Sequence, residues 1–160
     1  LTLSALAPRP GEVLWDIGAG SGSIGIEWLL AGGGRVEALE ADPTRAARAR
    51  TNVDAFGLSH RHRLTEARAP EGLAGLPTPD AVFIGGGASE ALLTTLWTLI
   101  LPGTRLVMNA VTLETEALVL DWSARQGGHL LKIELSETAP IGRKRAWRAA
   151  LPILQWSVTR

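Results

Sequence analysis

The residues best suited to chemistry in this sequence lie in one short stretch, residues 13–22. An apolar run with a single carboxylate, Asp16, leads directly into alternating glycines, which are Gly18, Gly20 and Gly22. Such a run is typical of a buried strand that ends at a nucleotide-binding turn, because glycine accepts positive φ angles and lets backbone N–H groups contact a bulky ligand. Residues 23–30 then have the pattern of the helix that follows such a turn. The alternative is a glycine-rich turn that binds nothing.

The glycine spacing distinguishes two kinds of cofactor. A literal G-x-G-x-x-G begins at Gly20 and by itself suggests a dinucleotide. In that fingerprint the first glycine directly follows the strand, but counting from Gly18 gives G-x-G-x-G, with Ser23 where the third glycine belongs. Asp16 also suits a cationic ammonium group better than a pyrophosphate. We therefore predict S-adenosylmethionine, which carries such a group, as the cofactor.

Two further features follow later strands. Glu40 ends a short alternating strand about twenty residues beyond the glycine loop, where doubly wound sheets place the carboxylate that binds a ribose diol. We assign Glu40 and the adjacent Ala41 to the cofactor, the alternative for Glu40 being a solvent-facing acid at a strand end. Gly85-Gly86-Gly87 follows the apolar strand 80–84. Ligands of open α/β sheets bind at the carboxyl ends of strands, so both glycine loops are expected to border one crevice unless the second is a plain turn.

The elements that must position these residues follow from the hydrophobic periodicity. It predicts strands at 13–17, 35–40, 63–66, 80–84, 104–109, 129–135 and 153–158, and helices at 23–30, 43–57, 90–101 and 113–126. The last two strands are expected to be antiparallel, because residues 136–148 supply no crossover helix. The fold class is therefore α/β: a doubly wound, Rossmann-like sheet, mostly parallel, with an antiparallel C-terminal strand.

Composition narrows the class of protein. A chain of 160 residues is long enough for one domain with its own core, and it has no cysteine for a disulfide or a thiolate metal site. Its three histidines lack the spacing of a ligand set, so we expect no metal. Sixteen basic and sixteen acidic residues balance, which gives no general attraction to nucleic acid or membranes. We expect a cytoplasmic single domain, residues 1–160, cut from a longer polypeptide, because the sequence begins with Leu1 and reaches its first strand quickly.

Three segments carry a resemblance to a known family: Leu14–Ser23, Phe83–Gly87 and Asn109–Thr115. The first resembles the class I S-adenosylmethionine-dependent methyltransferases, and the other two narrow the resemblance to the decarboxylating precorrin methyltransferases of cobalamin biosynthesis. The chain is similar to the C-terminal domain of a two-domain member. The resemblance implies methylation of one meso carbon of a precorrin, a tetrapyrrole, together with decarboxylation of an acetate side chain. It implies as partners the N-terminal methyltransferase domain of the same chain and further copies in a homo-oligomer, for example a tetramer.

The resemblance also implies roles for individual residues. The methionine end of the cofactor is assigned to Asp16, Gly18, Ala19, Gly20, Ser21, Gly22 and Gly85. The ribose is assigned to Glu40, and the adenine to Ala67, Arg68 and Ala69. Many class I enzymes have an aspartate where this chain has Arg68, so a backbone contact at Ala69 is the substitute that we expect. Substrate binding is assigned to Gly86, Gly87, Thr112 and Arg143.

The candidate catalytic residues are Glu114 and Asn109. A partly reduced tetrapyrrole is itself a carbon nucleophile, so methyl transfer needs alignment rather than a strong base. Glu114 lies at the start of a helix beyond the fifth strand and is either a proton shuttle or only a favourable acid at a helix N-terminus. Asn109 either binds a substrate carbonyl or only ends its strand. Arg143 belongs to a basic cluster that is either a clamp for substrate carboxylates or a solvated loop.

Three other functions compete with this prediction. A methyltransferase acting on RNA or protein would need a basic stripe with stacking aromatics, and only Trp147 accompanies the basic cluster. A dehydrogenase module is opposed by the glycine spacing and the antiparallel tail. A degenerate fold kept for subunit assembly is the third, and Arg68 is the residue that favours it.

Overall fold

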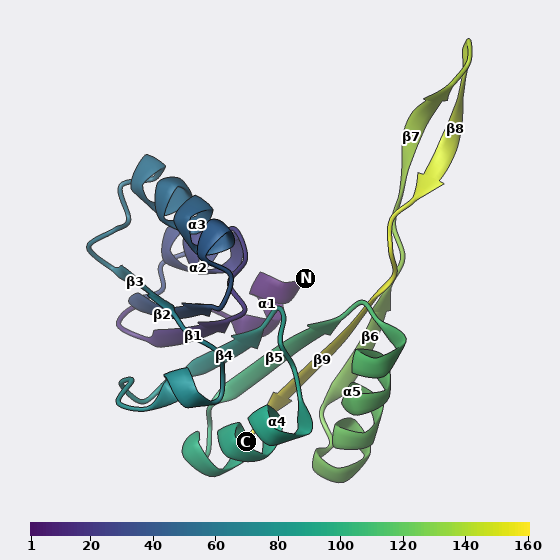
Figure 1. Ribbon diagram of the computed structural model, residues 1–160. Coiled ribbons are helices and arrows are strands. Elements are labelled where there is room, and N and C mark those ends of the chain that lie inside the picture. The colour runs from purple at the N-terminus through teal and green to yellow at the C-terminus, as the bar shows by residue number, and fades with distance from the viewer.

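The computed structural model describes residues 1–160 and contains a seven-stranded sheet with the order β3-β2-β1-β4-β5-β9-β6 (Figure 1). The strands are β1 (Val13–Ile17), β2 (Arg35–Glu40), β3 (His62–Glu66), β4 (Ala81–Ile84), β5 (Arg105–Ala110), β6 (His129–Ile133) and β9 (Ile153–Thr159). The first five are parallel, and β9 lies antiparallel between β5 and β6. The predicted fold class, including the antiparallel C-terminal strand, is therefore confirmed.

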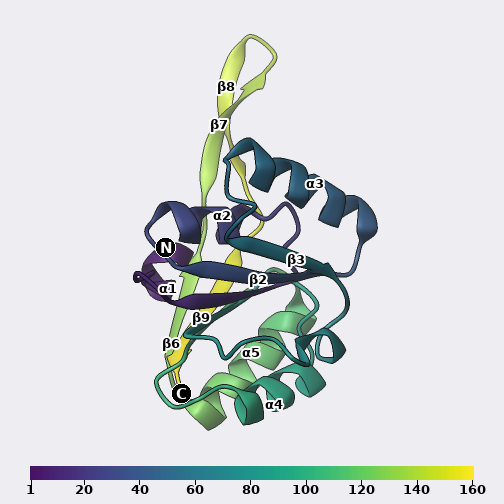
Figure 2. The same cartoon turned by 90° about the vertical axis from the view of Figure 1, so that its left-hand side faces the viewer.

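Helices cover both faces of this sheet. They are α1 (Thr2–Leu6), α2 (Ser23–Leu30), α3 (Pro43–Ala55), α4 (Glu90–Leu99) and α5 (Leu113–Gln126). Figure 2 shows α2 and α3 on one side of the sheet and α4 and α5 on the other. Each face has its own apolar core: one contains Leu6, Leu14 and Trp28, and the other contains Leu96, Met108 and Trp156. No helix is long and apolar enough to cross a bilayer.

The N-terminal segment and the link between β3 and β4 add detail that periodicity did not predict. Helix α1 packs against the sheet, and the Arg105 guanidinium on β5 holds it there by donating from Nε to the Leu6 carbonyl at 2.7 Å while pairing with Glu12. Between β3 and β4 the chain forms only a short 3-10 helix, η1 (Glu71–Leu73).

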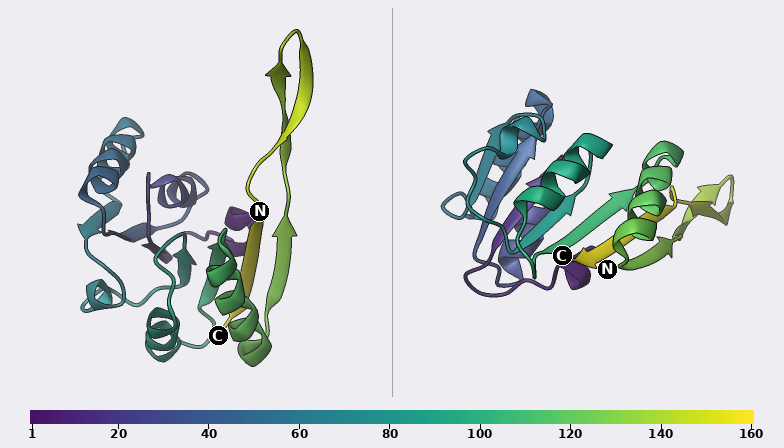
Figure 3. Two further views of the ribbon diagram at one scale, coloured as in Figure 1. Left: turned by 45° about the vertical axis from the view of Figure 1, so that its right-hand side comes forward. Right: turned by 90° about the horizontal axis from the view of Figure 1, so that it is seen from below.

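Residues 136–149 differ most from expectation. They form a separate two-stranded sheet, β7 (Ser136–Ile141) and β8 (Lys144–Ala149), which projects far from the rest of the molecule (Figures 1 and 3). The segment contains no crossover helix, as expected, but the hairpin itself was not predicted. Its physical reason is the two-residue turn Gly142-Arg143, where Gly142 has a φ of 58°, a conformation that suits a tight hairpin between strands.

Candidate active site

Two glycine loops meet at the carboxyl ends of β1 and β4. Gly18 has a φ of 70°, and a Cβ placed on it would lie 2.6 Å from the Gly86 carbonyl oxygen. The Gly85 N–H also donates to the Ile17 carbonyl at 2.9 Å. Because the two backbones touch, no side chain fits at residue 18, and the predicted proximity of the loops is observed.

Glu40 ties the first loop to the start of α3. Its Oε2 accepts from the Gly20 N–H at 2.8 Å, and its Oε1 accepts from the Asp42 N–H at 2.9 Å. The residue is only 4% exposed, yet it borders the cavity described next. A carboxylate has about four lone-pair sites, so two of them remain available to a ligand in this cavity.

A cavity of about 530 Å³ lies between these loops, β2 and the segment after β3. Ten residues predicted to bind cofactor or substrate line it, namely Gly18, Gly20, Glu40, Ala41, Ala67, Arg68, Ala69, Gly85, Gly86 and Gly87. Five further residues line it, namely Ile17, Leu39, Asp42, Pro43 and Arg45. Segments separated by up to about seventy residues thus line one cavity. This is expected, because open α/β sheets bind their ligands at the carboxyl ends of the strands.

The cavity fits the predicted cofactor in size and chemistry. Its volume is within the roughly 300–1,000 Å³ of small-molecule sites. Gly20, Gly86 and Gly87 have no atom within 4 Å of the position that a Cβ would take, so a ligand can approach their backbone closely. Leu39 and Ile17 provide apolar surface, and Glu40 provides unused acceptors beside the loop. These features suit a ligand with an apolar ring, a diol and a charged end.

Arg45 and Asp42 are the lining residues that sequence reasoning missed. Arg45 lies in the first turn of α3, and its Nε is 4.0 Å from Glu40 Oε1. Asp42 is the N-cap of α3: its side chain accepts from the Arg45 N–H at 2.9 Å, and this bond lowers the pKa of Asp42. The available signal was position, because α3 begins immediately after Glu40 and its first turn must face the same hollow.

Asp16 does not line the cavity, so the predicted direct contact with a cofactor ammonium group has no support in the geometry. The side chain is fully buried; Oδ2 accepts from the Gly25 N–H of α2 at 3.1 Å, and Oδ1 has no partner. Burial is the main cause that raises the pKa of Asp16 from 3.8 to about 7, with the Gly25 bond lowering it and the Glu40 charge raising it further. Asp16 therefore supports the loop from behind.

Ala19, Ser21 and Gly22 also lie outside the cavity lining. The Ser21 carbonyl accepts from Asn52 Nδ2 at 2.9 Å, which joins the loop to α3. Gly22 precedes α2 with a φ of 79°, and a Cβ placed on it would lie 3.3 Å from the Cβ of Ala49. These residues shape the loop, while Gly18 and Gly20 form its ligand-facing part.

Asn109 is used within the fold. Its Nδ2 donates to Thr2 Oγ1 at 3.0 Å, and its Oδ1 accepts from Gln155 Nε2 at 3.0 Å. Gln155 Nε2 also donates to Thr2 Oγ1 at 2.8 Å. Both amide ends of Asn109 therefore have protein partners, and the structure favours the strand-ending interpretation over contact with substrate.

Thr112, Glu114 and Arg143 lie outside the cavity lining. Thr112 is the N-cap of α5, accepting from the Thr115 N–H at 3.3 Å, and Glu114 is exposed in the first turn of that helix. They follow β5, so they share the sheet edge that carries the glycine loops. Arg143 is exposed at the turn of the β7–β8 hairpin. This hairpin leaves the sheet beside the carboxyl end of β5, where Leu154 pairs with Ala110 and Ile153 with Ile133, and its turn projects far from the sheet (Figure 1).

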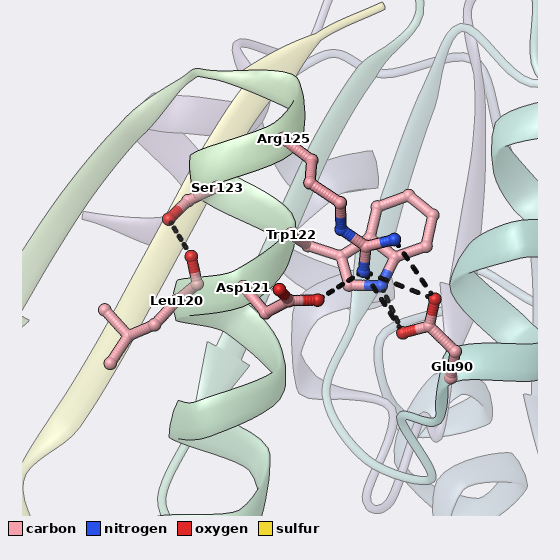
Figure 4. Close-up of polar contacts among 6 residues, drawn as sticks. All are labelled: Glu90, Leu120, Asp121, Trp122, Ser123 and Arg125. Atoms are coloured by element: carbon pink, nitrogen blue, oxygen red, sulfur yellow. Dashed lines mark hydrogen bonds and ion pairs between the residues drawn. The ribbon is translucent and has the colours of Figure 1, made fainter.

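Polar contacts of Glu90 with Trp122 and Arg125 join the start of α4 to α5 (Figure 4). We call this group the α4–α5 anchor. Glu90, the first residue of α4, accepts from Trp122 Nε1 at 2.7 Å and pairs with Arg125 at 3.3 Å. The Arg125 guanidinium lies 4.5 Å from the centroid of the Trp122 ring, and Trp97 packs edge-on against the same ring. Because α4 begins three residues after Gly87, this anchor fixes where that loop ends.

Comparison with known proteins places the chain in a family. A sequence model described as the precorrin methyltransferase domain matches residues 1–160. The chain belongs to the precorrin methyltransferase domain family. The solved C-terminal domain of precorrin-6Y C5,15-methyltransferase from Rhodobacter capsulatus has 53% identity and a TM-score of 0.95, covering 99% of this chain and 86% of that one. The predicted family and its fold are therefore confirmed.

Two curated relatives show how far the family extends. The precorrin-6Y C(5,15)-methyltransferase [decarboxylating] of Sinorhizobium sp is 51% identical over 162 residues, which is all of this chain and 39% of that protein. The probable cobalt-precorrin-6B C(15)-methyltransferase (decarboxylating) of Pyrobaculum aerophilum is 33% identical over 86% of this chain and 70% of its own length. The chain thus spans well under half of its longer relative.

Proposed function

We propose that this domain transfers a methyl group from S-adenosylmethionine to a meso carbon of a precorrin and removes carbon dioxide from an acetate side chain, in cobalamin biosynthesis. The observation that carries the proposal is the cavity between two glycine loops in a chain that is 51% identical, from end to end, to part of a decarboxylating precorrin methyltransferase. The remainder of that relative leads us to propose an N-terminal methyltransferase domain as a partner in the same polypeptide.

The cofactor supplies an electrophilic methyl group on a sulfonium. In our proposal Glu40 binds the ribose hydroxyls with its unused lone pairs, while the free N–H groups of Gly86 and Gly87 face the methionine end. Ala67 to Ala69 border the adenine, and a backbone contact at Ala69 replaces that of the usual aspartate, because the Arg68 guanidinium has no acceptor. The protein then has mainly to align the methyl group with the nucleophilic carbon, because the tetrapyrrole supplies the electrons itself.

Decarboxylation requires other groups. Loss of carbon dioxide from the acetate leaves an electron pair, which the conjugated ring accepts, and the remaining carbon must gain a proton. We propose Glu114 for that proton, since its exposed carboxyl lies at the edge of the sheet that carries the cavity. Thr112, one residue before α5, is proposed to bind the substrate at the same edge. Both residues are free of partners outside the first turn of α5.

We further propose that the domain works as a homo-oligomer, such as a tetramer. Every residue of β8 and nearly every residue of β7 is exposed, and an isolated two-stranded hairpin is marginally stable in water. A partner copy would bury its apolar side chains, including Ile141 and Trp147, which are 64% and 75% exposed. Arg143, at the turn between these strands, is then proposed to reach substrate carboxylates only in the assembly. Mass measurement of the native domain tests this.

The catalytic proposal is tested by incubating the domain with a precorrin and methyl-labelled cofactor, followed by mass spectrometry of the products. Glu114→Gln should leave cofactor affinity intact and should accumulate methylated product that retains its acetate. Glu116→Gln is the matched control, because Glu116 lies on the same helix but pairs with Lys132 at 2.8 Å. Normal decarboxylation by Glu114→Gln would leave that residue only its helix-start role, and absence of any label transfer would refute the proposed function.

A further inference from the structure

A second cavity lies at the opposite edge of the sheet from the candidate active site. Its volume is about 380 Å³, and it borders the amino ends of β2 and β3. β2 is six residues long, so at about 3.3 Å per residue the two cavities are separated by roughly 20 Å. Neither the cofactor nor the reacting part of a substrate bound at the glycine loops reaches this place.

The lining of the second cavity is strongly basic. Among its seven residues are Arg35, Arg61, Arg63, His60 and His62, and none is a carboxylate. Burial lowers the pKa of His62, so the positive charge is attributed to the arginines. Arg35 pairs with the buried Glu37, which neutralises one of the three guanidinium groups. No carboxylate lies within 4.0 Å of Arg61 or Arg63. Two guanidinium groups therefore face the same hollow without a partner of opposite charge.

A guanidinium nitrogen in this lining also lacks a hydrogen-bond partner. Arg61 Nη1 donates to the Gly33 carbonyl at 3.3 Å, but Arg61 Nε is buried and makes no hydrogen bond. Nε2 of His62 is also buried and unpaired, but it faces Gly25 of α2 and is not counted among the groups that a ligand in the cavity could contact. Leaving a buried donor unpaired is costly, and a guanidinium group carries its donors in a fork that matches an oxyanion.

We propose that this second cavity is a binding site for a phosphate-type oxyanion. Arg61 and Arg63 would hold the anion by charge-assisted hydrogen bonds, which are shorter and stronger than neutral ones. A nucleic acid is the less suitable ligand, because apart from the histidines no aromatic side chain lines the cavity for stacking against bases. The proposal does not depend on the methyltransferase activity, since the two sites occupy opposite edges of the sheet.

The test is a titration of the domain with inorganic phosphate, and separately with sulfate, at constant ionic strength set by sodium chloride. Calorimetry should show saturable binding of either anion, and thermal unfolding should shift to higher temperature with anion concentration but not with chloride alone. Arg61→Gln and Arg63→Gln should each weaken phosphate binding by about tenfold or more, because one charged hydrogen-bonding partner is lost.

Arg48→Gln is the matched control: Arg48 is an exposed arginine on α3 outside this cavity, and its replacement should leave phosphate affinity unchanged. Arg63→Gln keeps the test decisive if Arg61→Gln does not fold, since Arg63 is exposed on β3. Non-saturating binding, the same response to chloride, or equal losses in the Arg48 and Arg63 variants would each overturn the proposal.

Discussion

Replacing Asp16 by asparagine should stabilise the domain at pH 8 but not near pH 4. Burial raises the pKa of this carboxyl from 3.8 to about 7. Between these values the folded protein holds a proton that the unfolded chain has lost, so the wild-type protein loses stability as pH rises from about 4 to about 7. Each pKa unit is worth about 1.4 kcal/mol, and the shift of roughly three units therefore corresponds to about 4 kcal/mol at most.

Asparagine mimics the protonated form of Asp16. It retains an oxygen for the Gly25 N–H, and its amide places two N–H donors where the protonated carboxyl has one O–H without a partner. The variant should therefore be no more stable than the wild type near pH 4. As pH rises, only the wild type is forced to bury a charge, so the variant should become the more stable protein by up to about 4 kcal/mol above pH 7.

Urea unfolding followed by tryptophan fluorescence at intervals between pH 4 and 8.5 measures this difference. The free energy of unfolding of the variant minus that of the wild type should rise up to about pH 7 and then level off. Asp42→Asn is a control of opposite sign, because the pKa of Asp42 is lowered by the Arg45 N–H, and its variant should be the less stable protein at neutral pH. A flat difference for Asp16→Asn between pH 5 and 8 would refute the reasoning.

Three other substitutions test the site by independent routes. Glu40→Ala should weaken S-adenosylmethionine binding by about 1–3 kcal/mol in calorimetry, because it leaves loop N–H groups and ribose hydroxyls unpaired; unchanged affinity would contradict the ribose assignment. Gly18→Ala should lower the free energy of unfolding by more than Gly103→Ala, since both have positive φ but only residue 18 meets backbone within 3 Å. Glu90→Ala should cost about 1–3 kcal/mol of stability and shift the fluorescence of Trp122, whose Nε1 loses its acceptor; a cost below 0.5 kcal/mol, about that of an ordinary surface change, would argue against the anchor.

Much of the fold could be predicted because its signals are local. The bounds of β1, α2, β2 and α5 agree with the periodicity, since each element has one continuous apolar stripe or run between clear breakers. The β7–β8 hairpin was missed because it buries almost nothing, so it has no alternation of apolar and polar residues to detect. Helix α1 was missed for a related reason: five residues are too few to establish a helical period.

The site residues also divide into those whose position follows from local signals and those whose role does not. Glu40 could be assigned from its distance along the chain, because strand length and parallel packing place that residue beside the glycine loop whatever the surrounding sequence. The role of Asp16 could not be assigned in this way. Its place next to the loop in the sequence does not reveal whether the side chain points into the cavity or behind the loop. Asn109 shows the limit most clearly: its partners Thr2 and Gln155 are distant in sequence, and only the folded sheet brings them within 3.0 Å of its amide. Residues whose backbone lines the cavity are thus visible in the sequence, whereas the role of a polar side chain depends on contacts that only the packed fold supplies.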